Sequence, residues 1–492
     1  MNKADLKQNI DTDVLIIGAG IMGATLACLL KELNSNLKIN IVDMLKEPGM
    51  ESSEALNNAG TGHAGYCELN YTPLKQKKID IKRALEINAK FEVSLQFWSY
   101  LAKKYKYFKP KNFITITPHI SIVSGKNDIK FLKKRYLSLK KHHLFNDIEY
   151  SENPKIVKKW IPLLKGHSEE LAATRVIYGT DVDFGKITKN IIQILTTKKN
   201  FKIHQNFKAN SFSEIDGQLW KVEIEDLINK KQIEIHSKFV FIAAGGESIN
   251  LLHKTKIPEQ SGYAGFPVNG KWLVCKNQKI SQQHNVKVYG KAKIGSPPMS
   301  LPHMDIRVID GKKLLLFGPF ASFTFKFLRN GSNLSLINSI NYKNIKVMLF
   351  VLFKEWKLML YLIKQTFSSH QDKIKQLKKF YPNATASDWI LSPAGIRVQI
   401  IKPSKEHIAS LEFGTEIIYN KNKNLAALLG ASPGASVAVS SMLEVIEKCF
   451  GSNKIWKKKI AKIIPANSGE LIKNPSLIKK IRPYTLKRLN LN

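Results

Sequence analysis

Residues 13–23 read DVLIIGAGIMG, and this stretch decides the fold of the chain. The apolar run before Gly18 predicts a buried strand, and the residues after Gly20 predict the first turn of a helix. Gly18 permits the tight turn between them, Gly20 lets the backbone approach a pyrophosphate, and Gly23 lets the helix pack closely on the strand. The free N–H groups at the start of the helix would bind the phosphates. The stretch therefore predicts a dinucleotide-binding βαβ unit.

An acidic residue supports the same prediction. A second predicted strand, residues 38–42, is followed by Asp43, which comes 20 residues after Gly23. An acid at this spacing binds a ribose hydroxyl of the dinucleotide. NAD-dependent and FAD-dependent proteins share this pattern, so the next segment has to discriminate between the two cofactors.

Residues 51–73, ESSEALNNAGTGHAGYCELNYTP, favour FAD. A nicotinamide enzyme usually continues from the acid into another apolar helix and strand. Residues 44–73 instead have no sustained helical period and are rich in Gly, Asn, Ser and Thr. An extended polar segment of this kind fits a long flavin cofactor, whereas the alternative interpretation is a surface loop. The glycines that would let backbone approach a flat ring are Gly49, Gly60, Gly62 and Gly65.

Long blocks with a common family pattern extend over nearly the whole chain. They are residues 51–53, 57–63, 68–73, 172–175, 179–185, 262–268, 287–302, 305–311, 316–321, 388–389, 394–395, 397–402, 413–416 and 426–435. In these blocks the chain resembles the malate:quinone oxidoreductase family. Residues 54–56 and Ile396 depart from the family pattern inside matching blocks, which concerns local loop packing more than the reaction.

The resemblance implies an FAD-dependent, membrane-associated enzyme with a fold related to that of D-amino-acid oxidase. The expected fold class is α/β (α+β), with a Rossmann-like FAD-binding domain interleaved with a mostly β substrate domain that carries helical inserts. The implied activity is that of malate dehydrogenase (quinone), which oxidises (S)-malate to oxaloacetate in the tricarboxylic acid cycle. Electrons pass from FAD to a membrane quinone, so neither nicotinamide nor a metal is needed.

Two alternatives stay open. Another flavin-dependent 2-hydroxy-acid dehydrogenase or oxidase, such as one for L-2-hydroxyglutarate, would need a similar site. The blocks LPHMDIR, residues 301–307, and AGIRVQIIK, residues 394–402, favour malate through the resemblance. The second alternative is a non-catalytic flavoprotein or a basic membrane-binding protein.

The domains are expected to interleave along the chain, because oxidoreductases of this fold return repeatedly to the cofactor. Residues 451–492 would form a basic C-terminal extension. The FAD-binding domain would take residues 1–80, 170–250 and 400–450, and the substrate and quinone side would take residues 81–169 and 251–399.

The chain is strongly basic, with 77 Lys and Arg against 39 Asp and Glu and a formal net charge of +38. No nucleic-acid-binding motif accompanies these residues, so nucleic acid is not an expected partner. Because lysines are spread along the chain, we attribute most of the charge to compositional bias and the rest to attraction toward an anionic membrane. The widely separated cysteines predict neither a disulfide framework nor structural zinc. They are Cys28, Cys67, Cys275 and Cys449.

Residues 345–367, IKVMLFVLFKEWKLMLYLIKQTF, raise the question of membrane contact. Their charge-free runs are far shorter than the roughly 20 residues that span a bilayer. One interpretation is a helix that lies on the membrane with its lysines near the headgroups, and the other is a buried helix. The first predicted strand begins near Asp13, which leaves no room for a cleavable signal. The expected location is therefore the cytoplasmic face of the cell membrane, as a peripheral protein.

Oxidation of malate requires a proton acceptor and clamps for two carboxylates. Histidine suits the first role and arginine the second. His63, in AGTGHAG, is the leading base, and His303, in SLPHMDIR, is its rival. Arg307 and Arg397 are the preferred clamps, with Arg175 as a third. The alternative for each histidine is a structural bond to main chain, and for each arginine a structural ion pair.

The expected cofactor contacts come from three separated parts of the chain. These are the glycine-rich opening with the polar segment after it, the predicted strand at residues 238–243 with the small residues that follow it, and LLGASPGAS at residues 428–436. We expect FAD to contact Gly18, Gly20, Gly23, Asp43, Asn58, Gly60, Thr61, Gly62, Ala244, Gly245, Gly430, Ser432 and Gly434. No metal ligands are expected.

Overall fold

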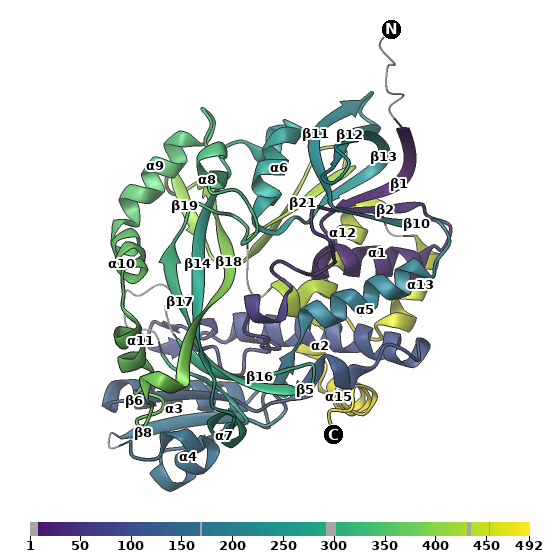
Figure 1. Cartoon of the computed structure of the whole chain (residues 1–492). Coiled ribbons are helices and arrows are strands. Elements are labelled where there is room, and N and C mark those ends of the chain that lie inside the picture. The colour runs from purple at the N-terminus through teal and green to yellow at the C-terminus, as the bar shows by residue number, and fades with distance from the viewer. Residues whose placement is uncertain (1–7, 168–169, 292–301, 431–433, 452) are drawn as a thin grey trace.

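The computed structural model describes residues 8–167, 170–291, 302–430, 434–451 and 453–492. A largely parallel sheet forms one half of the molecule, on the right in Figure 1. Its strand order is β10-β2-β1-β13-β12-β11, and β21 and β20 extend it from the C-terminal half of β13. The parallel strands are β1 (Gln8–Ile17), β2 (Ile39–Asp43), β10 (Phe201–Gln205), β13 (Gln232–Ile242) and β21 (Leu425–Gly430). The antiparallel strands are β11 (Phe207–Ile215), β12 (Leu219–Asp226) and β20 (Thr415–Tyr419).

The central strand β1 explains why this sheet forms. Val14, Leu15 and Ile16 are each fully buried, as expected for a strand that is covered on both faces. Because successive side chains alternate between faces, Val14 packs with the core that includes α1 and Leu15 with the core that includes β12. The helices of the first face are α1 (Ile21–Leu33), α5 (Phe184–Thr196) and α12 (Ala438–Phe450), and α6 (Ser248–Thr255) lies on the second.

A second sheet, of 9 strands, stands on the left in Figure 1. Its order is β19-β18-β14-β17-β16-β15-β6-β8-β7, and its neighbours are antiparallel except β15 and β6. The strands are β6 (His119–Ser124), β7 (Glu149–Ser151), β8 (Leu171–Val176), β14 (Ala264–Cys275), β15 (Lys287–Tyr289), β16 (His303–Ile309), β17 (Lys312–Phe323), β18 (Trp389–Pro403) and β19 (Ala409–Glu412). The chain therefore crosses between the two sheets several times, and the predicted α/β (α+β) fold class, with an interleaved, mostly β second part, is confirmed. The exact domain ranges stay a prediction.

Smaller elements join the sheets. The remaining strands are β3 (Leu74–Lys75), β4 (Lys78–Ile79), β5 (Ile114–Ile116) and β9 (Thr180–Val182). Among the described residues before position 300, the remaining α-helices are α2 (Lys82–Lys104), α3 (Lys126–Lys140), α4 (Pro154–Trp160) and α7 (Gln278–Gln283). Helix α2 is the longest of these, and it packs against the C-terminal helices.

The apolar segment at residues 345–367 forms two helices rather than one. Helix α9 (Ile345–Lys354) and helix α10 (Trp356–Thr366) meet at Glu355, and both follow the short helix α8 (Ser335–Asn338). One face of the pair is internal, because Val351 and Leu362 are buried against β14, β17 and β18. The opposite face is exposed. We call residues 335–367 the helical insert, and α11 (His370–Leu377) follows it.

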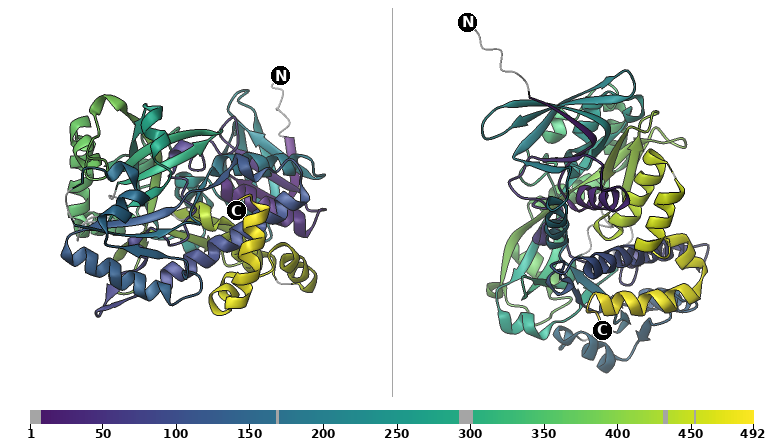
Figure 2. Two further views of the ribbon diagram at one scale, coloured as in Figure 1. Left: turned by 90° about the horizontal axis from the view of Figure 1, so that it is seen from below. Right: turned by 90° about the vertical axis from the view of Figure 1, so that its right-hand side faces the viewer.

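The C-terminal helices lie on the other side of the molecule from the helical insert (Figures 1 and 2). They are α13 (Lys454–Ile463), α14 (Ser468–Lys473) and α15 (Pro475–Arg488). Buried side chains such as Leu471 and Ile481 belong to the same core as α1 and α2. The basic C-terminal extension is therefore part of the folded unit.

Candidate active site

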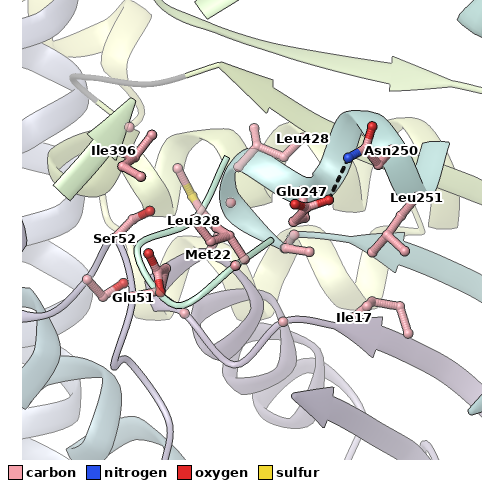
Figure 3. Close-up of a pocket in the computed structure, with 18 of the residues that line it drawn as sticks. Ile17, Met22, Glu51, Ser52, Glu247, Asn250, Leu251, Leu328, Ile396 and Leu428 are labelled. Atoms are coloured by element: carbon pink, nitrogen blue, oxygen red, sulfur yellow. Dashed lines mark hydrogen bonds between the residues drawn. The ribbon is translucent and has the colours of Figure 1, made fainter. Parts of the chain in front are cut away.

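A cavity of about 860 Å³ opens where the carboxyl ends of β1, β2 and β13 meet. Ile17, Val42 and Ala243, at the ends of these strands, all line it. Figure 3 shows Glu51 and Ser52 of the polar segment near Leu328 and Ile396 in the lining of this cavity, with Glu247 bonded to Asn250 farther along. Open α/β sheets bind ligands at this edge. The volume is within the range of small-molecule and cofactor sites, about 300–1,000 Å³.

The glycine-rich turn has the geometry that its sequence predicts. Gly18 has a φ of +111°, and an added Cβ there would lie 2.3 Å from the carbonyl oxygen of Ala243. An added Cβ at Gly23 would lie 2.2 Å from the oxygen of Gly18, so this glycine permits the helix to pack on the turn. At Gly20 the nearest protein atom to an added Cβ is Ser53 Oγ at 3.4 Å. Gly18 and Gly20 line the cavity, whereas Gly23 lies behind the turn.

The start of α1 and the acid after β2 both face this cavity. Gly20 is the N-cap of α1 and offers no side chain, and the N–H of Ile21 donates to Ser53 Oγ at 3.0 Å. The positive end of the helix dipole therefore faces the cavity and favours an anion there. Asp43 lines the cavity, and it also accepts hydrogen bonds from the backbone of Ala19 at 2.6 Å and of Leu45 at 2.8 Å. Burial raises the pKa of Asp43, and the two N–H donors oppose that shift. Asp43 therefore fixes the turn as well as facing the predicted ribose position.

The polar segment is held in place by its own side chains. The Asn58 amide donates to Glu54 O at 2.9 Å, and its oxygen accepts from Gly60 N at 2.9 Å. Thr61 Oγ1 lies 2.8 Å from Tyr289 Oη. Asn58, Gly60 and Thr61 line the cavity. Gly62 does not, because an added Cβ there would meet Thr180 Oγ1 at 2.1 Å, on the packed side of the segment.

The later glycine-rich stretches return to the same cavity. Ala244, Gly245, Gly430 and Gly434 all line it. Gly430 has a φ of +86°, and an added Cβ would lie 2.1 Å from the oxygen of Gly414. Ser432 lies outside the described residues. Three distant parts of the chain are thus brought together around one cavity.

His63 lines the cavity, and its side chain is 17% exposed. Its Nδ1 contacts a carboxylate oxygen of Glu68, which is almost fully buried. Burial alone would raise the pKa of Glu68, but the neighbouring His63 outweighs it and lowers this pKa to about 2. Glu68 is therefore an anion that holds the His63 ring by Nδ1. The His63 backbone N–H also donates to Ser436 Oγ at 3.0 Å, which joins the polar segment to the last return of the chain.

His303 lies outside the cavity lining in the described structure. Its ring stacks on Tyr289 with centroids 4.1 Å apart, and its Nδ1 lies 2.5 Å from Asp305. Burial tends to raise the pKa of Asp305, but His303 and Lys287 lower it overall. His303 therefore belongs to a buried pair beside Tyr289, whose Oη lies 2.8 Å from Thr61 Oγ1 of the cavity lining.

Of the three predicted arginine clamps, Arg397 is the one that lines the cavity. Burial lowers the pKa of Arg397, and the phenols of Tyr289 and Tyr71 oppose this shift. No carboxylate of the described residues contributes to it. Arg175 is bonded to Glu149 in the second sheet. Its guanidinium also lies 4.6 Å from the ring of Trp160.

Arg307 is fully buried rather than open to a substrate. Its Nε lies 2.7 Å from Asp181, and its Nη1 donates to the oxygen of Asn58 at 2.6 Å. An added Cβ at Gly60 would lie 2.2 Å from Arg307 Cζ, which explains why this position is glycine. Lys287 joins the same group, 3.0 Å from Asp181 and 2.8 Å from the oxygen of Ala59. Arg307 thus supports the polar segment from behind.

The sequence did not predict the residues that orient the candidate site residues. Glu68 lies five positions after His63, at the start of the next family block, so this short spacing was the available signal. Ser436 ends the LLGASPGAS stretch, and its neighbour Gly434 was predicted. Asp181 and Lys287 had no such signal, because their pairing comes from strands that are far apart in the chain.

The chain matches a family model described as malate:quinone oxidoreductase over residues 10–491. A relative from Methylobacillus flagellatus, named a probable malate:quinone oxidoreductase, is 47% identical over 99% of this chain and 100% of its own length. A relative of the same name from Flavobacterium psychrophilum is 46% identical over 99% of both chains.

Solved structures resemble the fold. Glycine oxidase from Bacillus cereus has a TM-score of 0.59 at 16% identity, covering 90% of this chain and 96% of its own. The L-alpha-glycerophosphate oxidase from Mycoplasma pneumoniae, solved with FAD bound, has a TM-score of 0.56 at 16% identity, covering 89% of this chain and 95% of its own. At this identity the likeness extends to the fold alone.

Proposed function

The chain belongs to the malate:quinone oxidoreductase family, and we propose on that premise that it is an FAD-dependent malate dehydrogenase (quinone). It oxidises (S)-malate to oxaloacetate, a step of the tricarboxylic acid cycle, and delivers the electrons to a membrane quinone. We base this on one observation above all, which is that His63 and Arg397 line the same cavity as the glycine-rich nucleotide turn.

The residues of the cavity fit FAD. Gly20 and the N-terminus of α1 would hold the pyrophosphate, and Asp43 would hold a ribose hydroxyl. Gly60, Gly245 and Gly430 contribute to the lining through their backbone. The chemistry that FAD supplies when bound is acceptance of two electrons from an organic substrate and their later release to a quinone.

The chain supplies the proton acceptor and a carboxylate site. Oxidation of malate at C2 removes a hydride from carbon and a proton from the hydroxyl. We propose that His63 takes this proton on Nε2, because Glu68 already occupies Nδ1 and stabilises the cation that forms. Arg397 would bind a substrate carboxylate through paired N–H donors. It is suited to this role because no carboxylate of the described residues pairs with it.

We further propose that the protein docks on an anionic membrane through the helical insert. Phe353 and Phe367 are each 83% exposed, and Trp356 is about half exposed on the same helices. Large exposed apolar side chains of this kind mark contact with a membrane or a partner. Exposed lysines alternate with them, so that the apolar side chains would enter the bilayer and the ammonium groups would meet lipid phosphates. These lysines are Lys343, Lys346, Lys354, Lys357 and Lys364.

Several of these cations already lie next to aromatic rings. Lys357 Nζ lies 5.8 Å from the ring of Trp356, and Lys343 Nζ lies 5.7 Å from that of Tyr342. Within the described ranges, no helix is long and apolar enough to cross a bilayer. The proposed location is the cytoplasmic face of the cell membrane, as a peripheral protein with a quinone as its electron acceptor.

Anaerobic flavin reduction tests the proposed function. The purified protein should have a flavin absorption spectrum, and L-malate should bleach it. L-2-hydroxyglutarate and D-malate should act much more slowly, and a soluble quinone should restore the colour. If L-2-hydroxyglutarate reduces the flavin faster than L-malate does, L-2-hydroxyglutarate is the substrate instead of malate. If the protein is purified without flavin and cannot be loaded with FAD, the proposal is refuted.

A further inference from the structure

The arginines of this chain are few, and most have a structural partner. Only 8 of the 77 basic residues are arginine. Arg135, Arg175, Arg307, Arg329 and Arg482 are each bonded to carboxylates, carbonyls, a hydroxyl or an amide, and Arg488 lies over the ring of Tyr484. The other two are Arg397, which lines the cavity, and Arg83, at the start of α2, which lies over the ring of Tyr71 and has one long bond to Phe413 O. Neither forms an ion pair with an acid of the described residues.

The start of α2 lies against the segment that carries His63. An added Cβ at Gly65 would lie 3.2 Å from Ala84 Cα, and Asn88 Nδ2 donates to Ala64 O at 2.8 Å. These contacts fix the first turns of α2 directly beside the two residues that follow His63. Arg83 therefore has a defined place relative to the predicted proton acceptor, although its side chain is exposed.

The guanidinium of Arg83 contacts the polar segment and the residues that lead to Thr415, although Arg83 itself is not among the residues that line the cavity. Its Cζ is 5.1 Å from the ring centre of Tyr71, at the end of the polar segment. Its Nη2 donates to Phe413 O at 3.4 Å, a long bond that leaves most of the guanidinium unused. Thr415, two residues farther along, lines the cavity. Tyr71 is buried, and its phenol is within the electrostatic reach of both Arg83 and Arg397.

We propose that Arg83 binds the second carboxylate of a dicarboxylic 2-hydroxy acid while Arg397 binds the first. This inference rests on the proposed function and adds a specificity-determining residue to it. Two carboxylates at opposite ends of a short carbon chain suit two cations, and Arg83 and Arg397 are the two arginines within electrostatic reach of the Tyr71 phenol. The N-terminus of α2 adds positive potential beside Arg83. Arg83 therefore takes the clamping role that we predicted for Arg307, whose guanidinium is occupied by Asp181 and main-chain oxygens.

The test compares a dicarboxylic with a monocarboxylic substrate in the FAD-loaded enzyme. Arg83→Gln should raise the KM for L-malate by about tenfold, because one charge-assisted contact is lost. The kcat at saturating malate should stay near that of the wild type. The affinity for L-lactate, measured as a substrate or as a competitive inhibitor, should not change, since lactate has no second carboxylate. Arg83→Lys should lie between the two proteins.

Lys82→Gln is the matched control, because it removes one exposed positive charge from the neighbouring position of the same helix. It should leave the preference for malate over lactate unchanged. An unchanged preference in Arg83→Gln, or an equal loss for both compounds, would overturn the role of Arg83 while leaving malate oxidation intact. Failure of the wild-type protein to oxidise malate would instead refute the proposed function, and the assignment of Arg83 with it.

Discussion

The buried carboxylate of Glu68 contacts Nδ1 of the His63 imidazole. Because Glu68 is ionised, it favours the tautomer with the proton on Nδ1, and Nε2 is the nitrogen that remains to accept a proton. The backbone of His63 is fixed at the same time by Ser436. The ring of the proposed base is thus oriented from two sides before any substrate arrives.

The first prediction concerns the base itself. His63→Gln should slow malate-dependent flavin reduction by about 10²–10⁴-fold, because the hydroxyl proton loses its acceptor. FAD content should stay normal, since the substitution keeps the backbone bond to Ser436. Stopped-flow absorbance measures the rate. His303→Gln is the comparison, and its rate should remain close to that of the wild type, because His303 lies beside Tyr289, outside the cavity lining. A large loss in His303→Gln alone would move the base role to that residue.

The second prediction concerns acid stability. The pKa of Glu68 falls from its ordinary 4.5 to about 2 in the folded protein. A carboxyl group whose pKa is lower in the folded than in the unfolded protein stabilises the fold at pH values above its unfolded pKa. This contribution is lost as the pH falls from about 4.5 toward 2. Glu68→Gln should therefore destabilise the protein at pH 7 and weaken the pH dependence of unfolding below 4.5. Urea unfolding followed by circular dichroism at several pH values measures both, and parallel curves for the two proteins would contradict the prediction.

The third prediction separates cofactor binding from folding at the nucleotide turn. Gly20→Val should fold but lose FAD, because the nearest protein atom to an added Cβ is Ser53 Oγ at 3.4 Å while the rest of the side chain would enter the cavity. Gly23→Val should fail to fold normally, since an added Cβ would lie 2.2 Å from Gly18 O. Flavin absorbance and thermal unfolding of the pair distinguish the two effects. Full flavin occupancy in a well-folded Gly20→Val protein would contradict this location for the pyrophosphate.

The fourth prediction concerns the membrane. The combined substitutions Phe353→Ser, Trp356→Gln and Phe367→Ser should weaken binding to anionic vesicles by at least about tenfold, because three large apolar contacts are removed. Malate-dependent flavin reduction should not change, since these side chains point outward. Co-sedimentation with phosphatidylglycerol vesicles measures the binding.

The control for the membrane test lies on the opposite side of the molecule. Ile455→Ser and Tyr484→Ser remove exposed apolar groups from the C-terminal helices, which face away from the helical insert (Figure 2). Vesicle binding should survive these changes. If it is instead lost with them, while the triple variant of the insert still binds, the docking surface is on the C-terminal helices.

The sequence by itself determined the fold class, and most of the residues that it predicts to contact FAD line one cavity, because these features depend on local patterns. The residues DVLIIGAGIMG specify a strand, a turn and a helix by apolar runs and glycine spacing, and Gly18 and Gly20 line the cavity as that pattern predicts. His63 was also found from its own segment. Such signals are readable because the residues that create the geometry are neighbours in the chain.

Tertiary structure decided which charged side chains are available. Arg307 and Arg397 both lie in blocks that match the family pattern. Arg307 is paired with Asp181 and bonded to main-chain oxygen of the polar segment, whereas Arg397 lines the cavity. Arg83 drew no attention in the sequence, because only the packing of α2 against the His63 segment brings it beside Tyr71. The physical reason is that a charge is structural or functional according to the partners that folding brings within a few ångströms of it, and those partners come from distant strands and helices.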